Sequence, residues 1–157
     1  MNLYEFFQTW VDHPKKGNGR KNLNHTDEAW KKVLNNIQIW ESSEKKEDNE
    51  FAKYIKYTGK LRRVHLDLDN VNFNNHYVSW TAVENLEDIY WFNSSIPHTI
   101  ITAEATKENP GISVKGFIEA MKLVIPNFEL NSPAIRAEHE VIFPLQEKTI
   151  LSIEKIK

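Results

Sequence analysis

The first third of the chain repeats its apolar side chains at helical spacing. Residues 3–11 follow this spacing until Pro14 and Gly17 interrupt it. Thr26 can cap a second predicted helix, one face of which is apolar: Ala29, Trp30, Val33, Leu34, Ile37 and Trp40. After a polar stretch, apolar residues resume at 51–57 and stop before a glycine. We therefore expect a helical N-terminal part over residues 1–58.

Further along the chain the apolar period changes to two, which is typical of strands. Strands are predicted at 61–68, 77–80, 99–105, 137–143 and 149–153. Two predicted helices interrupt them. One opens at a capping box formed by Thr81 and Glu84, and the other opens at Ser113. Helices first, followed by strands with interspersed helices, favour an α+β fold over an alternating βαβ fold.

The composition fits one globular domain. The chain has 157 residues, of which 40% are hydrophobic and 27% are charged, and it has no cysteine. We expect a single domain over residues 1–157, with a β-rich part over 59–157. The lack of cysteine excludes disulfides and thiol nucleophiles and favours a reducing, cytoplasmic setting. No apolar run approaches the length of a membrane span, so no membrane association is expected.

The net charge of −2 predicts no general attraction to nucleic acid. The nearest basic feature is residues 15–21, which hold four cations. Such a run is more often a solvated loop than a binding arm, and a nucleic-acid- or nucleotide-binding domain is only a third interpretation. His65, Asp67, Asp69 and His76 come nearest to a metal cluster, but no second group completes the coordination, so no metal is expected.

The first candidate segment for chemistry is an arginine pair at the start of the predicted strand 61–68. Period two puts Arg63 on the face opposite Val64, so its guanidinium can face a cleft, and Arg62 is the reserve candidate. A guanidinium is a planar fork that binds phosphate or ribose oxygens through two hydrogen bonds. The structural alternative is a surface cation that protects an edge strand from aggregation.

Two further segments supply hydroxyls and carboxylates. Ser79 and Thr81 lie at a predicted strand end, where they can offer hydroxyl groups to a ligand. Glu138 and Glu140 lie two residues apart on a late strand and therefore share one face. The structural alternatives are a helix cap at Thr81 and a solvated strand face for the two glutamates. Each segment alone is weak evidence for a functional site. Their order and their placement on strands make the three segments stronger evidence together.

The order Arg, Ser-x-Thr, Glu-x-Glu resembles the Arg-Ser-Glu signature of toxin-type mono-ADP-ribosyltransferases, over residues 61–144. The resemblance implies a mostly antiparallel core of two β-sheets, with the helical N-terminal part packed on it and the site in a cleft between the sheets. It also implies an NAD-dependent enzyme that transfers ADP-ribose to a protein acceptor, and Glu-x-Glu favours arginine as the acceptor side chain.

The resemblance assigns roles to individual residues. Four residues are expected to bind NAD or to shape the nicotinamide pocket: Arg63, Ser79, Trp80 and Thr81. Glu140 corresponds to the catalytic glutamate, which accepts a hydrogen bond from a ribose hydroxyl and stabilises the oxocarbenium-like state. Glu138 corresponds to the residue that orients and deprotonates the acceptor.

Three features depart from the family pattern: the doubled arginine, the bulky Trp80 within Ser-x-Thr, and His139 between the glutamates. They leave room for an inactive relative. The second interpretation is a non-enzymatic protein-binding module, such as an inhibitor, an immunity protein or a phage-type effector, on the same or another α+β fold. An enzyme should bring the Arg, Ser and Glu side chains together at one concave pocket, whereas a module should splay them beside an exposed apolar patch.

Overall fold

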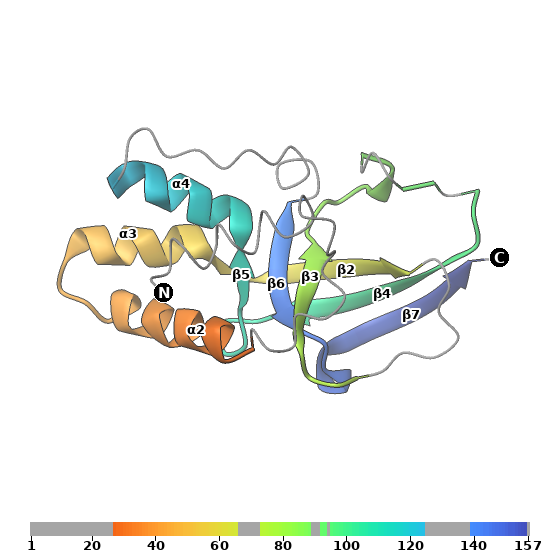
Figure 1. Cartoon of the computed structure of the whole chain (residues 1–157), viewed down its shortest axis with the longest axis horizontal. Helices are drawn as coiled ribbons and strands as arrows, with labels where there is room; N and C mark the ends of the chain where they lie inside the picture. Colours follow the sequence, from red (N-terminus) through yellow and green to blue (C-terminus); the bar gives the residue numbers. More distant parts are fainter. Residues whose placement is uncertain (1–26, 66–72, 89–91, 94, 125–138, 157) are drawn as a thin grey trace.

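The computed structural model of the chain describes residues 27–65, 73–88, 92–93, 95–124 and 139–156 (Figure 1). The described helices are α2 (Asp27–Glu41), α3 (Lys46–Ile55) and α4 (Val114–Val124), with 3-10 turns η3 (Leu86–Asp88) and η4 (Glu147–Thr149). The strands are β1 (Lys56–Tyr57), β2 (Gly59–His65), β3 (Tyr77–Thr81), β4 (His98–Ala105), β5 (Gly111–Ser113), β6 (Glu140–Pro144) and β7 (Ile150–Ile156). This content confirms the predicted α+β class. The helix predicted at 3–11 lies outside the described residues.

The three helices gather at one end of the molecule, beside β5 (Figure 1). The predicted apolar face of α2 is confirmed, because Trp30, Val33 and Ile37 are buried. The predicted start of α4 is confirmed as well, since the Ser113 hydroxyl accepts a hydrogen bond of 2.9 Å from the backbone N–H of Gly116. The polar run before Phe51 is expected to be a connector or a helix start, and α3 begins inside it at Lys46, which confirms the second alternative.

The described strands form one antiparallel sheet in the order β1-β5-β6-β3-β2-β4-β7, so the expectation of two sheets is corrected to one. The join between β2 and β3 is a single register pair, Arg62 with Thr81, whereas β2 and β4 pair over the whole of β2. Figure 1 shows β3 and β6 running across the direction of β2, β4 and β7. The sheet therefore bends sharply at the pair Arg62 and Thr81, where we expected a cleft between two separate sheets.

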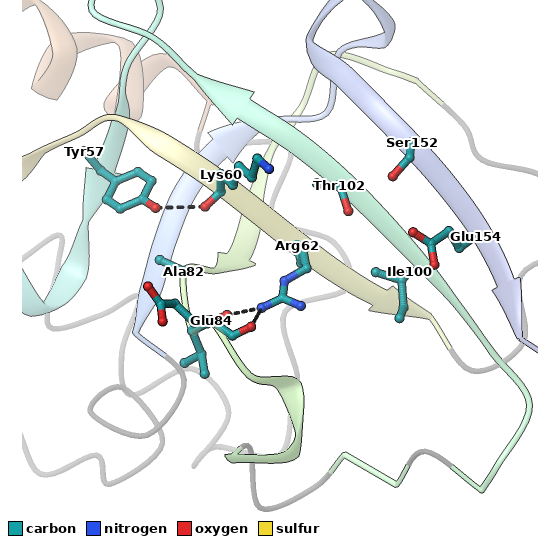
Figure 2. A pocket seen from close by; sticks show the side chains of 10 residues that line it. Tyr57, Lys60, Arg62, Ala82, Glu84, Ile100, Thr102, Ser152 and Glu154 are labelled. Carbon is teal, nitrogen blue, oxygen red and sulfur yellow. Dashed lines mark hydrogen bonds between the residues drawn. The ribbon is translucent and has the colours of Figure 1, made fainter.

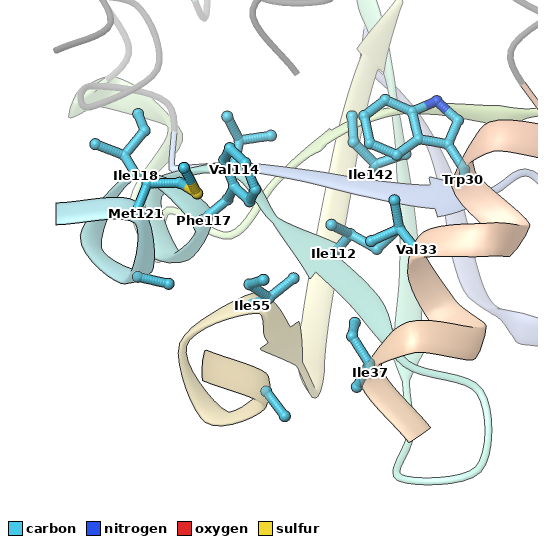
Figure 3. Packing of buried hydrophobic residues seen from close by; sticks show 12 residues of the cluster. Trp30, Val33, Ile37, Ile55, Ile112, Val114, Phe117, Ile118, Met121 and Ile142 are labelled. Atoms are coloured by element: carbon cyan, nitrogen blue, oxygen red, sulfur yellow. The ribbon is translucent and has the colours of Figure 1, made fainter. Parts of the chain in front are cut away.

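The two faces of the sheet pack differently. One face, which we call the Leu61 face, curls in on itself around a buried cluster: Leu61, Trp80, Ile101, Ala103, Ala105, Val141, Phe143 and Leu145. The other, the Arg62 face, is covered by the helices only at its β5–β6 end, where Ile112 and Ile142 pack against α2, α3 and α4 (Figure 3). The β2–β4–β7 end of the Arg62 face carries exposed charged side chains instead: Lys60, Glu104 and Glu154.

The helix predicted to open at Thr81 is wrong over the described residues. Thr81 ends β3, and the chain then forms only the short turn η3. A local side chain competes with the helix, because the Asn85 amide oxygen accepts a 3.0 Å hydrogen bond from the backbone N–H of Glu87, which an α-helix would direct to the carbonyl of Val83. Arg62 then holds the loop by donating to the backbone carbonyls of Val83 and Glu84. The Thr81 hydroxyl still accepts a hydrogen bond from the backbone N–H of Val83, at 3.2 Å, so the capping residue caps a turn.

The carboxylate of Asp27 joins the helices to the sheet. Asp27, the first residue of α2, lies 2.7 Å from Nδ1 of His76 and accepts a 3.0 Å hydrogen bond from the backbone N–H of Tyr77. This contact fixes the start of α2 at the start of β3. Among the described residues, no helix is both long enough and apolar enough to cross a membrane.

Candidate functional site

Five polar side chains form one row across five strands of the Arg62 face. Glu140 of β6 pairs with Thr81 of β3, and Thr81 pairs with Arg62 of β2. Arg62 pairs in turn with Thr102 of β4, and Thr102 pairs with Ser152 of β7. Because register partners in an antiparallel sheet share a face, all five side chains project to the same side. With about 4.8 Å between neighbouring strands, the row measures roughly 19 Å along the sheet.

Arg62 occupies the middle of this row and holds the loop that follows β3. Its Nη2 atom donates to the carbonyls of Val83 and Glu84, as the dashed lines in Figure 2 show. A guanidinium has five N–H donors, so the Nε and Nη1 groups are not used by these two hydrogen bonds. Arg62 therefore fixes a loop and still presents N–H donors at the open face of the sheet.

The Ser79 hydroxyl donates a hydrogen bond to the Glu140 carboxylate, and this contact joins β3 to β6. Both residues lie on the Arg62 face, since Ser79 is two positions from Thr81 along β3. Glu140 is only 2% exposed, so the alternative that it belongs to a solvated strand face is wrong. The hydroxyl supports a buried carboxylate, which needs such hydrogen bonds to lie away from water.

A cavity of about 620 Å³ opens on the Arg62 face beside this row (Figure 2). It is lined by Tyr57, Lys60, Arg62, Ala82, Val83, Glu84, Ile100, Thr102, Ser152 and Glu154. Its volume lies within the range of small-molecule sites in proteins. Ser79, Thr81 and Glu140 do not line it, so the cavity covers the β2–β4–β7 side of the row and Glu140 lies beyond it.

Arg63 lies on the opposite side of the sheet from this cavity. Its Nη1 atom donates to the backbone carbonyl of Ser79 at 2.5 Å, and its Nε has no hydrogen-bond partner among the described residues. Burial lowers the pKa of the Arg63 guanidinium. The predicted opposition to Val64 is confirmed, but the face that carries Arg63 is the one that buries Leu61. The NAD-binding role predicted for Arg63 remains untested, and Arg62 is the arginine at the cavity.

His65 follows Arg63 on the same face, two positions along β2. Its burial, together with the positive charge of Arg63, lowers the pKa of the imidazole to about 4. Its Nε2 atom has no hydrogen-bond partner in the described part of the chain. His65 is therefore neutral in the folded protein at neutral pH, and it joins the structural side of the sheet rather than the cavity.

Trp80 also points away from the cavity. It is 2% exposed, its indole Nε1 donates to the backbone carbonyl of Phe143 at 3.0 Å, and its ring meets the ring of Phe143 edge to face. These contacts satisfy the polar atom of the indole and place the ring in the core. The NAD-binding role predicted for Trp80 remains untested, and the structure does not bring Trp80 to the row.

The segment before Glu140 is only partly described. Glu138 lies outside the described residues. Of the predicted Glu-x-Glu pair, the structure therefore describes only Glu140. His139 has a φ of 47°, and its ring lies edge to face with that of Tyr57, with centroids 6.1 Å apart. Tyr57 in turn donates a 2.8 Å hydrogen bond to the carbonyl of Lys60. The turn that leads into β6 thus contacts a residue of the cavity wall.

Sequence reasoning missed the β4–β7 wall of the cavity, which is formed by Thr102, Ser152, Glu154 and Ile100. Alternation along two predicted strands was the only sequence signal, and every amphipathic strand shows it. The sequence pattern does not say which strands become neighbours in the sheet, so the wall could not be predicted from it. In the part of the chain that the structure describes, no three metal-binding side chains come together.

Comparisons of the chain with family models, curated proteins and solved structures find no match. The geometry of the Arg62 face is therefore the basis for assigning a function.

Proposed function

We propose that the protein is an NAD-dependent mono-ADP-ribosyltransferase that modifies a protein acceptor. The observation that carries the proposal is the row from Glu140 through Thr81 to Arg62 on one face of the sheet. A buried carboxylate and an arginine lie two strand spacings apart, or roughly 10 Å, with hydroxyl groups between them. This order suits a ligand with an anionic middle and a reactive end. It also keeps the Arg, Ser and Glu elements of the resemblance, with Arg62 as the arginine.

Arg62 supplies the contact to the pyrophosphate of NAD in this proposal. The guanidinium matches phosphate oxygens through two parallel hydrogen bonds, and Lys60, on the same face of β2, adds a second positive charge. Because Arg62 also holds the carbonyls of Val83 and Glu84, its position is set before the ligand arrives. Preorganisation of this kind lowers the free-energy cost of ordering a side chain on binding.

Glu140 supplies the catalytic carboxylate. When the bond between nicotinamide and ribose C1′ breaks, nicotinamide leaves with the bonding electron pair and positive charge develops on the ribose. A carboxylate that accepts a hydrogen bond from the ribose 2′-hydroxyl stabilises that charge, and shielding from water strengthens the effect. Ser79 orients the carboxylate through its hydroxyl group. An acceptor nucleophile then bonds to C1′ and loses its proton.

The acceptor side of the reaction rests on the sequence alone. Glu138 keeps its predicted role of orienting and deprotonating the acceptor, for which arginine on a protein is the favoured side chain. The cytoplasmic setting expected from the cysteine-free composition belongs to the same proposal. Thr81, between Glu140 and Arg62 in the row, shapes the site for the nicotinamide ribose.

The proposal is tested by transfer of label from NAD. Purified protein is incubated with NAD radiolabelled in its ADP-ribose part and with a cell extract, beside the variants Glu140→Gln and Glu147→Gln. Glu147 is an exposed carboxylate in η4, so its variant controls for loss of one charge. We expect a labelled extract protein with the wild type and with Glu147→Gln, and none with Glu140→Gln. No labelled protein, together with no rise in melting temperature on adding NAD, contradicts the proposal.

A second candidate function is a non-enzymatic protein-binding module. It is favoured by the edge strand β7, on which three large apolar side chains are exposed: Leu151, Ile153 and Ile156. An exposed edge strand can pair with a strand of another protein. Arg62 lines the cavity while Ser79 and Glu140 do not, so the Arg, Ser and Glu elements share one face of the sheet but not one pocket. We prefer the enzyme because the second candidate leaves the polar row and the cavity without a role.

A further inference from the structure

The cavity has a second wall that the proposed function does not use. Figure 2 shows it on β4 and β7, across from Arg62, and it consists of Ile100, Thr102, Ser152 and Glu154. Thr102 and Ser152 are register partners, and so are Ile100 and Glu154. All four therefore project from the Arg62 face, as two adjacent cross-strand pairs. The wall offers two hydroxyls, one carboxylate and one apolar surface.

The β2 side of the cavity carries two cations and one carboxylate, and the β7 side carries one carboxylate. The cations Lys60 and Arg62 are on β2, whereas Glu154 is on β7, two strand spacings or roughly 10 Å away. The other carboxylate of the lining, Glu84, belongs to the loop that Arg62 holds. A phosphate group is favoured near β2 and disfavoured near Glu154. The β7 side instead suits a neutral group rich in hydroxyls.

Resting on the proposed function, we propose that this wall binds the adenosine half of NAD and that Glu154 selects NAD over NADP. With the pyrophosphate at Arg62 and the nicotinamide ribose toward Glu140, the adenosine extends in the other direction along the same row, over Thr102 and Ser152. The Glu154 carboxylate accepts a hydrogen bond from the 2′-hydroxyl of the adenosine ribose. The apolar surface of Ile100 lies beside it and packs against the adenine ring.

The selectivity follows from the chemistry of the ribose 2′-position. A carboxylate accepts a hydrogen bond from a 2′-hydroxyl, and dinucleotide-binding folds use an acidic residue in this way to recognise NAD. The 2′-phosphate of NADP has no donor to offer when ionised, and its negative charge is repelled by the carboxylate. The cations that attract phosphate lie on β2, on the far side of Thr102, where they contact the pyrophosphate instead.

The test compares calorimetric affinities for NAD and for NADP in the wild type and two variants. Glu154→Gln removes the charge at the proposed subsite. Glu104→Gln removes a charge from an exposed residue on the same face of β4 that does not line the cavity, so it is the matched control. We expect the wild type and Glu104→Gln to bind NAD at least about tenfold more tightly than NADP, and Glu154→Gln to lose most of that ratio.

The outcomes separate this inference from the function on which it rests. If NAD binds but the wild type does not discriminate, or if Glu154→Gln leaves the ratio unchanged, the subsite is wrong while the proposed function survives. Equal effects of Glu154→Gln and Glu104→Gln also overturn the inference, because they indicate a general charge effect. If neither nucleotide binds to any of the three proteins, both the inference and the proposed function are overturned.

Discussion

The hydroxyl of Ser79 donates a hydrogen bond to the carboxylate of Glu140, although the two residues are 61 positions apart in the chain. The backbone carbonyl of Ser79 accepts another hydrogen bond from Arg63, which reaches it from the other side of the sheet. Ser79 therefore connects the buried carboxylate of the proposed site to the core of the bend. In the proposed function its side chain orients Glu140, while its backbone carbonyl accepts the hydrogen bond from Arg63.

Replacing Ser79 with alanine should slow the release of nicotinamide from NAD roughly 10- to 150-fold, because a hydrogen bond to a charged group contributes about 1.5–3 kcal/mol. Ser79→Thr keeps the hydroxyl and should retain most of the rate. Steady-state release of nicotinamide measures both variants. Equal rates for Ser79→Ala and the wild type would show that the hydroxyl does not orient Glu140 for catalysis.

Alanine substitution of the two neighbouring arginines should affect different properties, namely NAD affinity for Arg62 and stability for Arg63. Arg62→Ala removes the guanidinium that is proposed to bind the pyrophosphate, so NAD affinity should fall at least about tenfold. Arg63→Ala leaves the Ser79 carbonyl unpaired and a gap in the core, so the free energy of unfolding should fall by about 2 kcal/mol. Calorimetry with NAD and urea unfolding separate the two effects. A loss of NAD affinity in folded Arg63→Ala with none in Arg62→Ala would return the cofactor contact to Arg63.

His65 should make the protein less stable as the pH falls from about 6.5 to about 4. The unfolded chain takes up a proton at the ordinary imidazole pKa of 6.5, whereas the folded chain holds His65 neutral until about pH 4. Acidification across this window therefore favours the unfolded state, and the effect levels off below it. Urea unfolding at pH 7.5 and pH 5 should show a smaller loss for His65→Gln than for the wild type.

A residual loss is expected in His65→Gln, because burial also lowers the pKa of His139. If the free energy of unfolding depends on pH in the same way in the wild type and in His65→Gln, folding does not lower the pKa of His65.

Gly116 marks the close contact between α4 and α3. A Cβ atom at this position would lie 1.6 Å from the backbone oxygen of Tyr54, so the helices must move apart to accept Gly116→Ala. The expected loss is about 3 kcal/mol in the free energy of unfolding, although alanine favours a helix more than glycine does. Lys115→Ala, at an exposed position of the same helix, is the control and should change stability by less than about 0.5 kcal/mol. A stable Gly116→Ala would mean that the two helices are further apart.

The parts of the fold that local pattern determines were predictable from the sequence. The apolar face of α2 and the serine cap of α4 are local features, and both are confirmed. The helix after Thr81 was wrong because the Asn85 side chain bonds the backbone N–H of Glu87, and Arg62, which is distant in sequence, holds the resulting loop. The single sheet was missed for a similar reason, since the pairing of β2 with β3 at one position is a tertiary choice.

The site was predictable in its residue types but not in its register. Period two correctly separated Arg63 from Val64, but it does not say which face of a strand is buried. Leu61 shares the face of Arg63 and is fully buried, which turns Arg63 inward and leaves Arg62 at the cavity. Trp80 on β3 also lies on the buried Leu61 face, which turns its ring away from the cavity. The row that joins Glu140 to Ser152 depends on four strand pairings, none of which leaves a local signal.

In the proposed function, Glu140 acts on NAD that is bound along the Arg62 face. The most direct measurement determines NAD affinity and nicotinamide release together for the wild type and for Glu140→Gln. We expect Glu140→Gln to bind NAD with nearly the wild-type affinity and to release nicotinamide at least roughly 100-fold more slowly, because the carboxylate stabilises charge that develops in the transition state. Unchanged release by Glu140→Gln, or no NAD binding by the wild-type protein, would contradict the proposed function.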